Sequence, residues 1–221
     1  MGRKTPAIAS EGYARLLSLE EFHALEGKLT QWRRKNELLG MDGEKKQGGV
    51  LPFIVGLRLS AELIYTLRQR LSGFDVEVDW GHLLDDSGRC VSPECDIIIH
   101  KPGAFARWNG DHKDPVMNFC FIERGKCLAV VSCKSFAKRI DTCYCEQMKP
   151  YQGNVLLFAE CCCPGKDEVL REKAKEAGYK GFWYLYTFDP RGDIITHNEV
   201  VWLDFLKAVY HIVGRRGKAR K

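Results

Sequence analysis

The sequence predicts an α/β fold in which a mixed central sheet is flanked by helices on both faces. Two observations favour this class. Segments with helical spacing alternate along the chain with segments of strand character, an order typical of sheets that carry packed helices. In addition, the run from Leu128 to Lys134 is mostly apolar on both of its alternating sides, which indicates a strand covered from both directions.

Composition indicates a folded protein of ordinary charge. The 221 residues are enough for one well-buried domain, and 45% hydrophobic with 11% aromatic residues excludes a largely disordered chain. The net charge of +5 permits a polyanionic partner without identifying one. No apolar run is long enough to span a membrane, and Met1–Lys4 lack the apolar segment of a signal peptide, so we expect a cytoplasmic protein.

Two helices are predicted in the first third of the chain. Ser18 and Glu21 form a capping-box pattern that opens a helix continuing through Leu39. Residues 40–49 are rich in Gly and Lys and read as a linker, after which helical spacing resumes over 53–71. The expected division is an N-terminal arm, helix and linker over 1–49, a main folded domain over 50–214 and a basic tail over 215–221.

The remainder of the chain alternates strands and helices. Strands are predicted over 75–80, from Asp96, and over 119–123, 126–134, 154–159 and 182–187. Helices are predicted over 136–148, 166–177 with Gly178 as its end, and 199–213. Residues 101–118 form a polar insertion rich in Pro, Gly and Asn.

Two of the predicted strands carry polar residues where a buried strand should have none. Side chains alternate faces along a strand, so Asp96 and His100 share one side of the first, and Ser132 and Lys134 share one side of the second. A lysine at the end of a buried strand needs a partner, because an unpaired buried charge is costly. A carboxylate, a phosphate or a metal-held water would serve, so this pairing indicates a functional site.

The order of these elements resembles the core of the PD-(D/E)XK nuclease superfamily. The resemblance covers 52–187 and rests on a helix, an antiparallel meander with Asp96 on its second strand, and a following strand that ends in x-x-Lys at Lys134. It implies a restriction-endonuclease-like core in which the Asp and a second acid, two residues before the Lys, bind Mg²⁺. Glu94 shares a face with Asp96, and we prefer Asp96 as the ligand because it leads directly into an Ile-rich core strand.

The sequence departs from the family at the second acid, where it has Ser132. Serine cannot supply a charged oxygen to Mg²⁺. The motif is similar to that of a branch of type II restriction endonucleases that have Ser-x-Lys and place the missing carboxylate on the next helix, where this chain offers Glu146. Glu62 on the preceding helix resembles an additional acid of the superfamily. Which of Glu94, Glu62 and Glu146 completes the metal site stays open.

The resemblance implies a magnesium-dependent DNA endonuclease that hydrolyses phosphodiester bonds, as a restriction or other anti-phage enzyme. In such a site carboxylates hold Mg²⁺ against the scissile phosphate, and a lysine orients the attacking water and stabilises the developing charge. The candidate catalytic residues are Asp96, Lys134, Glu146, Glu62 and Ser132. The candidate metal ligands are Asp96, Glu146, Glu94 and the backbone carbonyl of Cys133.

Basic segments provide candidate contacts to double-stranded DNA. Clustered Lys and Arg side chains can follow phosphates, and Arg and Asn in the insertion are suited to reading base edges. The candidates are Arg33, Arg34, Lys35, Arg107, Asn109, Arg215 and Arg216. We also expect a homo-oligomer. The sequence does not distinguish DNA from RNA.

Two other functions compete with the endonuclease. One is a nuclease fold that lost its second acid at Ser132 and only binds nucleic acid or a protein partner. The other is a zinc-bound interaction protein built on the ten cysteines, with Cys143, Cys145 and the run 161–163 as ligands. No Cys-x-x-Cys pair occurs and no His lies at zinc-finger spacing, which favours reduced thiols.

Overall fold

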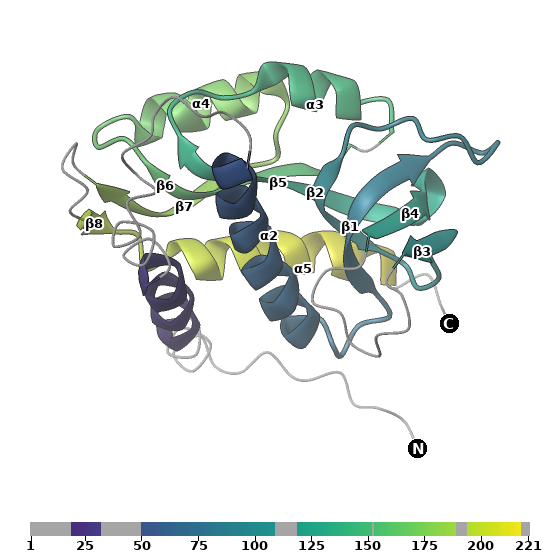
Figure 1. Ribbon diagram of the computed structural model, residues 1–221, viewed down its shortest axis with the longest axis horizontal. Helices are drawn as coiled ribbons and strands as arrows, with labels where there is room; N and C mark the ends of the chain where they lie inside the picture. The colour runs from purple at the N-terminus through teal and green to yellow at the C-terminus, as the bar shows by residue number, and fades with distance from the viewer. Residues whose placement is uncertain (1–18, 32–49, 109–118, 152, 189–193, 218–221) are drawn as a thin grey trace.

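The computed structural model describes residues 19–31, 50–108, 119–151, 153–188 and 194–217. They form one mixed eight-stranded sheet with the strand order β3-β4-β1-β2-β5-β6-β7-β8, and helices lie on both of its faces (Figure 1). The predicted fold class, an α/β protein with a mixed central sheet between helices, is therefore confirmed.

The first half of the chain supplies one edge and the centre of the sheet. A helix over residues 19–31 precedes it. The elements that follow are α2 (Val50–Arg70), β1 (Glu77–Leu84), β2 (Cys95–His100), β3 (Ala106–Trp108) and β4 (Phe119–Glu123). The short β3 lies inside the segment that the sequence predicted to be an irregular insertion.

The second half completes the sheet and adds the remaining helices. Its elements are the 3₁₀ turn η1 (Arg124–Lys126), β5 (Cys127–Ala137), α3 (Thr142–Met148), β6 (Val155–Cys162), α4 (Asp167–Ala177), β7 (Phe182–Phe188), β8 (Ile194–His197) and α5 (Val201–Gly217). Gly178 ends α4 with φ +99°, in the left-handed conformation that glycine adopts readily, as the sequence predicted. The edge strand β8 was not predicted.

The boundary between β5 and α3 differs from the expectation. A helix was predicted from residue 136, but β5 continues to Ala137, and Phe136 and Ala137 pair with Cys161 and Cys162 of β6. The parallel ladder satisfies backbone groups that a helix would otherwise satisfy locally, so the strand continues. The helix begins only at Thr142, with Asp141 as its N-cap.

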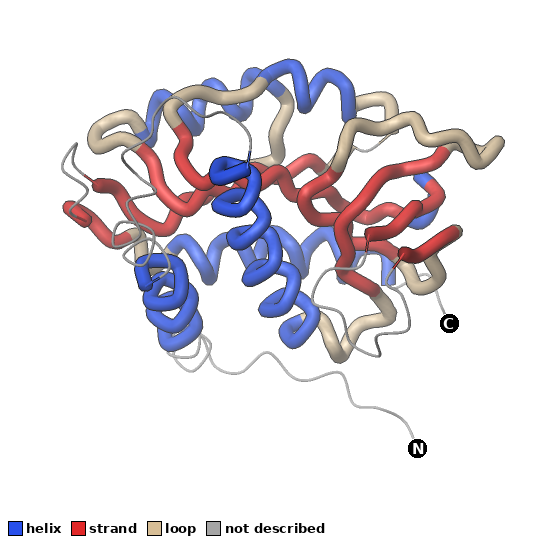
Figure 2. Tube along the Cα trace, in the orientation of Figure 1, coloured by secondary structure: helices blue, strands red, loops and turns tan. Residues whose placement is uncertain are grey.

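The sheet lies between helices on its two faces (Figure 2), and an apolar layer fills the space on each side. On one face, α2, α5 and the helix over 19–31 pack with side chains such as Val131 of β5; on the other, α3 and α4 pack with side chains such as Val130. The strand β5 is therefore covered from both sides, as its apolar sequence predicted. Within the described ranges no helix combines the length and apolar character needed to cross a membrane.

A buried ion pair connects α2 to the sheet. Glu160 of β6 is fully buried and accepts hydrogen bonds from Arg58 of α2 and from the hydroxyl of Tyr186. Arg58 also donates from Nη1 to the carbonyl oxygen of Leu29 at 2.8 Å. One guanidinium therefore joins the helix over 19–31, α2 and β6.

We expect Arg58→Met to destabilise the fold by about 3–5 kcal/mol, because it removes the cation that pairs with a buried carboxylate. Urea unfolding of the two proteins measures the difference. The double variant Arg58→Met with Glu160→Gln is the control and should recover part of the loss, because the charge is removed as well. A loss below about 1 kcal/mol for Arg58→Met would contradict this interpretation.

Candidate active site

Polar side chains gather where β2 begins and β5 ends. The two strands are antiparallel, with Ile97 opposite Val131, and continuing this register sets Asp96 opposite Ser132. The backbone N–H of Cys133 donates to Asp96 Oδ2 at 2.7 Å, which fixes the carboxylate between the strands. The Asp and the Ser-x-Lys motif, far apart in sequence, are thus neighbours in the structure.

Gly81 shapes the sheet beside this site. It lies at an irregularity of the β1–β2 pairing, opposite Cys95, with φ +151°. A Cβ atom there would lie 1.8 Å from the carbonyl oxygen of Cys120, so only glycine allows β1 and β4 to approach this closely. Ser92 stabilises this irregular part of the β1–β2 pairing, since its hydroxyl accepts a hydrogen bond from the N–H of Leu83 at 2.8 Å.

The Asp96 carboxyl group is costly to ionise in this environment. Burial raises its pKa, and the charge of Glu94 raises it further. The Cys133 N–H, the charge of Lys134 and the nearby Ser132 hydroxyl lower it but do not compensate, so the pKa of Asp96 stays above its ordinary value. A divalent cation at this carboxylate would remove the penalty, so the electrostatics favour cation binding.

Two hydroxyl groups near Asp96 support the same conclusion. Ser132 Oγ and Tyr144 Oη are buried, and neither makes a well-formed hydrogen bond to a described residue. The Ser132 hydroxyl lowers the pKa of Asp96, although the two groups do not meet the geometry of a hydrogen bond. Burial raises the pKa of the Tyr144 hydroxyl, and Cys95 and Asp96 raise it further. Buried polar atoms are normally satisfied. Two buried hydroxyls without a well-formed hydrogen bond, both near the same carboxylate, fit a place where a hydrated ion or a ligand binds.

Lys134 has a carboxylate partner that the sequence did not indicate. Its Nζ lies 4.0 Å from Oδ2 of Asp141, and both side chains are partly exposed. The other carboxylate oxygen of Asp141 accepts the N–H of Tyr144 at 3.2 Å as the N-cap of α3. The available signal was the preference of helices for an Asp N-cap, and the predicted start of this helix near residue 136 concealed it.

The two other predicted acids have surroundings of their own. Glu146 is on the exposed face of α3, since Cys145 and Met148 form its buried side. Glu62 lies on the side of α2 that meets the helix over 19–31, where it accepts a hydrogen bond from Lys28 at 3.0 Å. The structure therefore gathers Asp96, Ser132, Lys134, Glu94 and Asp141.

The predicted DNA contacts are only partly described. Arg107 of β3 donates to Glu77 at 2.6 Å and to Asp79 at 2.8 Å, so its guanidinium is engaged within the protein. Arg215 and Arg216 belong to the last turn of α5. The residues Arg33, Arg34, Lys35 and Asn109 lie outside the described ranges.

The cysteines of the zinc alternative are spread over several environments. All ten cysteines of the chain are free. Cys145, Cys161 and Cys162 are buried among apolar side chains, while Cys143 is exposed on α3.

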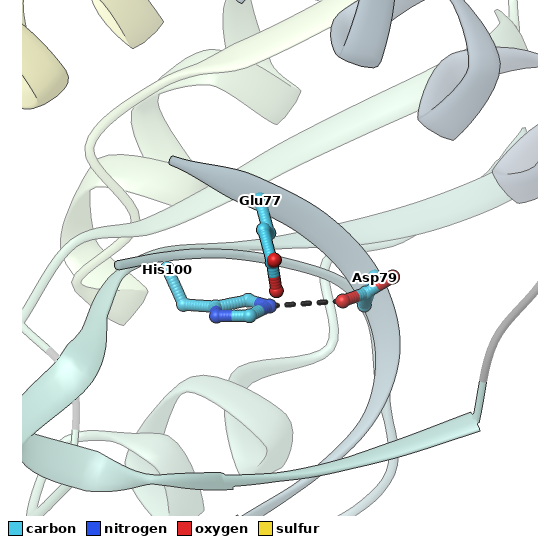
Figure 3. Close-up of side chains that lie close together, drawn as sticks. All are labelled: Glu77, Asp79 and His100. Carbon is cyan, nitrogen blue, oxygen red and sulfur yellow. Dashed lines mark hydrogen bonds and ion pairs between the residues drawn. The ribbon is translucent and has the colours of Figure 1, made fainter. Parts of the chain in front are cut away.

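A second polar cluster lies at the other end of β1 and β2 (Figure 3). Ligand atoms of Glu77, Asp79 and His100 lie within 4.8 Å of one another, and His100 Nε2 is 3.0 Å from Asp79 Oδ2. His100 Nδ1 faces the carbonyl oxygen of Lys101 at 2.7 Å and donates to it. Carboxylates with an oriented imidazole are compatible with a divalent metal ion.

The carboxylates of this second cluster already form ion pairs with arginine side chains. Arg68 donates to Asp79 Oδ1 at 2.6 Å, and Arg107 contacts both acids. Burial alone would raise the pKa of Asp79, but the hydrogen bond from His100 and the charges of Arg107, His100 and Arg68 outweigh it and lower that pKa. A metal ion would have to displace Arg107. The cluster therefore fits an ion network that joins α2, β1, β2 and β3, although among the described residues it is the one group of three such ligand atoms within 4.8 Å of one another.

Comparison with solved structures identifies similar folds. NucC of Pseudomonas aeruginosa ATCC27853, in its cAAA-bound form, is 13% identical with a TM-score of 0.56 over 90% of each chain. NucC of Escherichia coli MS115-1, also cAAA-bound, is 11% identical with a TM-score of 0.57 over 94% of each chain. The chain shares its overall fold with these two structures. No family model and no curated protein matches the sequence.

The raised pKa of Asp96 predicts a stability gain on neutralising it. A carboxyl group whose pKa is higher in the folded state destabilises the fold progressively as pH rises through the unfolded and then the folded value. Asn at this position keeps an oxygen that accepts the Cys133 N–H but carries no charge. We expect Asp96→Asn to raise the melting temperature at pH 7.5 by about 2–4 °C for each kcal/mol recovered.

Thermal unfolding followed at several pH values measures this effect. The difference between the two proteins should shrink below about pH 4, where the wild-type carboxyl is protonated in both states. A lower melting temperature for Asp96→Asn at pH 7.5 would show that the ionised carboxylate stabilises the fold instead.

Proposed function

We propose that this protein is a Mg²⁺-dependent endonuclease that hydrolyses phosphodiester bonds in DNA. The observation that carries the proposal is the half-buried Asp96 carboxylate, which the Cys133 N–H holds across from Ser132 with Lys134 in electrostatic reach, beside the buried hydroxyls of Ser132 and Tyr144 that make no well-formed hydrogen bond. The NucC-like nuclease fold supports the same reaction class.

The ligand set would be all oxygen, which suits Mg²⁺. Asp96 supplies one carboxylate, and the backbone carbonyl of Cys133 is the proposed neutral ligand. When bound, Mg²⁺ supplies Lewis acidity toward the scissile phosphate and makes a coordinated water more acidic. The small side chain at Ser132 contributes a hydroxyl where the superfamily motif has an acid.

Asp141 is the best candidate for the second acid. Its carboxylate is fixed by the N-cap hydrogen bond to Tyr144 and lies 4.0 Å from Lys134 Nζ. The proposal keeps the idea of an acid displaced to the helix after β5, but places it at the first cap position of α3 rather than at Glu146. Glu94 is the remaining alternative, because its charge acts on Asp96.

The other side chains have roles that follow from their positions. Lys134 is a partly exposed ammonium whose Nζ can donate to a phosphate oxygen or to the attacking water. Tyr144 offers a buried hydroxyl donor beside Asp96. Asp96 is held by the Cys133 N–H, so its free oxygen is oriented before substrate arrives.

The biological setting is part of the proposal. Both structural neighbours are NucC proteins in cAAA-bound forms, and we propose that this chain likewise works in anti-phage defence, as a homo-oligomer acting on double-stranded DNA. Because the neighbours bind cAAA, this cyclic nucleotide belongs in the assay as a possible activator. The alternative function is a catalytically inactive module that binds nucleic acid or a protein partner, and Ser132 in place of an acid is the observation that favours it.

We expect the protein to cleave plasmid DNA with Mg²⁺ and not with EDTA, in the presence or absence of cAAA. Asp96→Ala and Lys134→Ala should each lower the rate by about 100-fold or more, because each removes a group that acts on the reacting phosphate. Lys28→Ala is the matched control, since Lys28 is another partly exposed lysine that pairs with a carboxylate, Glu62, away from the site.

DNA binding without cleavage under every condition would favour the inactive module. Cleavage by Asp96→Ala at the wild-type rate would show that the site is wrongly assigned.

Two acids of the same short helix distinguish the proposals for the second ligand. Asp141→Asn removes the charge but keeps an oxygen for the N-cap bond, so helix α3 should stay folded. We expect Asp141→Asn to lower the rate by about 100-fold and Glu146→Gln to leave it within about threefold of wild type. The reverse pattern would restore Glu146 as the ligand, and loss of activity only in Glu94→Gln would assign the role to Glu94.

A further inference from the structure

The candidate site lies on the face of the sheet that α3 and α4 cover. Val130 packs in that layer, and Lys134 follows it at an even spacing along β5, so the two side chains share one side of the strand. Ile98 packs in the same layer and shares its side of β2 with Asp96. A surface that contacts the same substrate therefore lies on the α3 and α4 side of the sheet.

Three exposed cations accompany α3 on this side, and we call them the α3 strip: Arg139, Lys149 and Lys180. Arg139 lies two residues before the N-cap Asp141, and Lys149 is the C-cap of the helix. Lys180 comes from the turn after α4, and its charge, like that of Lys149, acts on the Cys145 thiol of α3 to lower its pKa against the larger effect of burial. The strip therefore begins beside the candidate site and follows the whole helix.

The cations of the strip have no ionic partner among the described residues. Arg139 is the one arginine with a described side chain that neither pairs with a described carboxylate nor donates to a described group. The others that do so are Arg58, Arg68, Arg70, Arg89, Arg107, Arg124 and Arg171. Lys149 and Lys180 likewise form no ion pair with a described acid. Glu146 is an exposed acid of α3, so three cations stand against one carboxylate.

The backbone under the strip is anchored in the core. Ile140, next to Arg139, packs into the α3 and α4 layer. The hydroxyl of Tyr179, next to Lys180, donates to the carbonyl oxygen of Asp141 at 2.8 Å, and the Lys180 N–H donates to a carbonyl oxygen of β6 at 2.8 Å. Exposed charges on a fixed backbone form a preorganised anionic binding surface, because little chain entropy is lost when a ligand binds.

Lys138, the neighbour of Arg139, does not belong to the strip. Its Nζ lies 5.1 Å from the centroid of the Phe136 ring, and that ring packs against the other layer, which α2 and α5 cover. Two adjacent exposed cations therefore have different surroundings, and Lys138 is a close control for Arg139.

We propose that the α3 strip binds successive phosphates of one strand of duplex DNA and so positions the scissile phosphate at the candidate site. The inference rests on the proposed nuclease function and adds to it the path of the DNA backbone. A helix of seven residues is about 10 Å long, and one DNA strand carries a phosphate per about 3.4 Å of axis, so the strip matches about three phosphates. Phosphate contacts carry no sequence information, so duplexes of any sequence bind.

The salt dependence of duplex binding tests the strip separately from cleavage. Fluorescence anisotropy with Ca²⁺ in place of Mg²⁺ gives the slope of log affinity against log salt concentration. Each phosphate contact contributes about 0.9 to this slope, which is about eightfold in affinity for a tenfold change in salt. We expect each of Arg139→Gln, Lys149→Gln and Lys180→Gln to make the slope shallower by about 0.9, and the triple variant to make it shallower by about 2.7.

Two exposed lysines outside the strip provide matched controls. Lys138→Gln removes the neighbouring charge, and Lys207→Gln removes one from α5, which covers the opposite face of the sheet. Both should leave the slope unchanged, and Arg139→Lys should retain it because the charge is kept. In Mg²⁺ the triple variant should raise KM for plasmid DNA while kcat stays within about threefold, because the strip binds the backbone away from the reacting atoms. Circular dichroism checks that each variant is folded.

An unchanged slope in Arg139→Gln and in the triple variant would overturn the strip, as would equal changes in the two control variants. A change of oligomeric state in the triple variant would also overturn it, by assigning these cations to contact with a second copy of the chain. Failure of the nuclease proposal is a separate result: strip-dependent duplex binding in Ca²⁺ without any cleavage in Mg²⁺ would retain the strip and reject the catalytic function.

Discussion

The antiparallel pairing of β2 with β5 is the constraint on which the candidate site depends. It sets Asp96 opposite Ser132, and the Cys133 N–H that donates to Asp96 Oδ2 at 2.7 Å fixes the carboxylate there. A shift of one residue would turn every side chain of β2 to the other face. The buried Ile97, Ile98 and Ile99 prevent that shift, because both apolar layers are filled only in the observed register. Core packing thus positions the chemistry.

Two aspartates on neighbouring strands show how the surroundings of a carboxyl group set its pKa. Asp79 is surrounded by Arg68, Arg107 and His100, which lower its pKa and leave no deficit of positive charge. Asp96 is half-buried, Lys134 is only within electrostatic reach of it, and the pKa of Asp96 is raised. The first arrangement stabilises the fold, whereas the second carries an electrostatic cost that a bound cation relieves. Charge compensation, rather than the presence of acids, separates a structural network from a candidate catalytic site.

The acids expected near Lys134 show what the sequence pattern cannot determine. The helical stripe from residue 136 pointed to a helix that would carry Glu146 near the sheet. The pairing of Phe136 and Ala137 with β6 extends the strand instead, so the helix begins later, at Thr142. As a result Glu146 lies on the exposed face, and the cap residue Asp141 approaches Lys134.

The sequence by itself determined the fold class and the two-sided burial of β5, because local alternation of apolar side chains acts over a few residues. The expectation that Asp96, Ser132 and Lys134 belong to one site came from the resemblance to the nuclease superfamily, since these residues are far apart in the chain. Only the tertiary structure decided that Asp141 accompanies Lys134 and that Arg107 turns inward to Asp79. Those outcomes depend on strand order and register, because a side chain's partner across a sheet is chosen by neighbours distant in the chain.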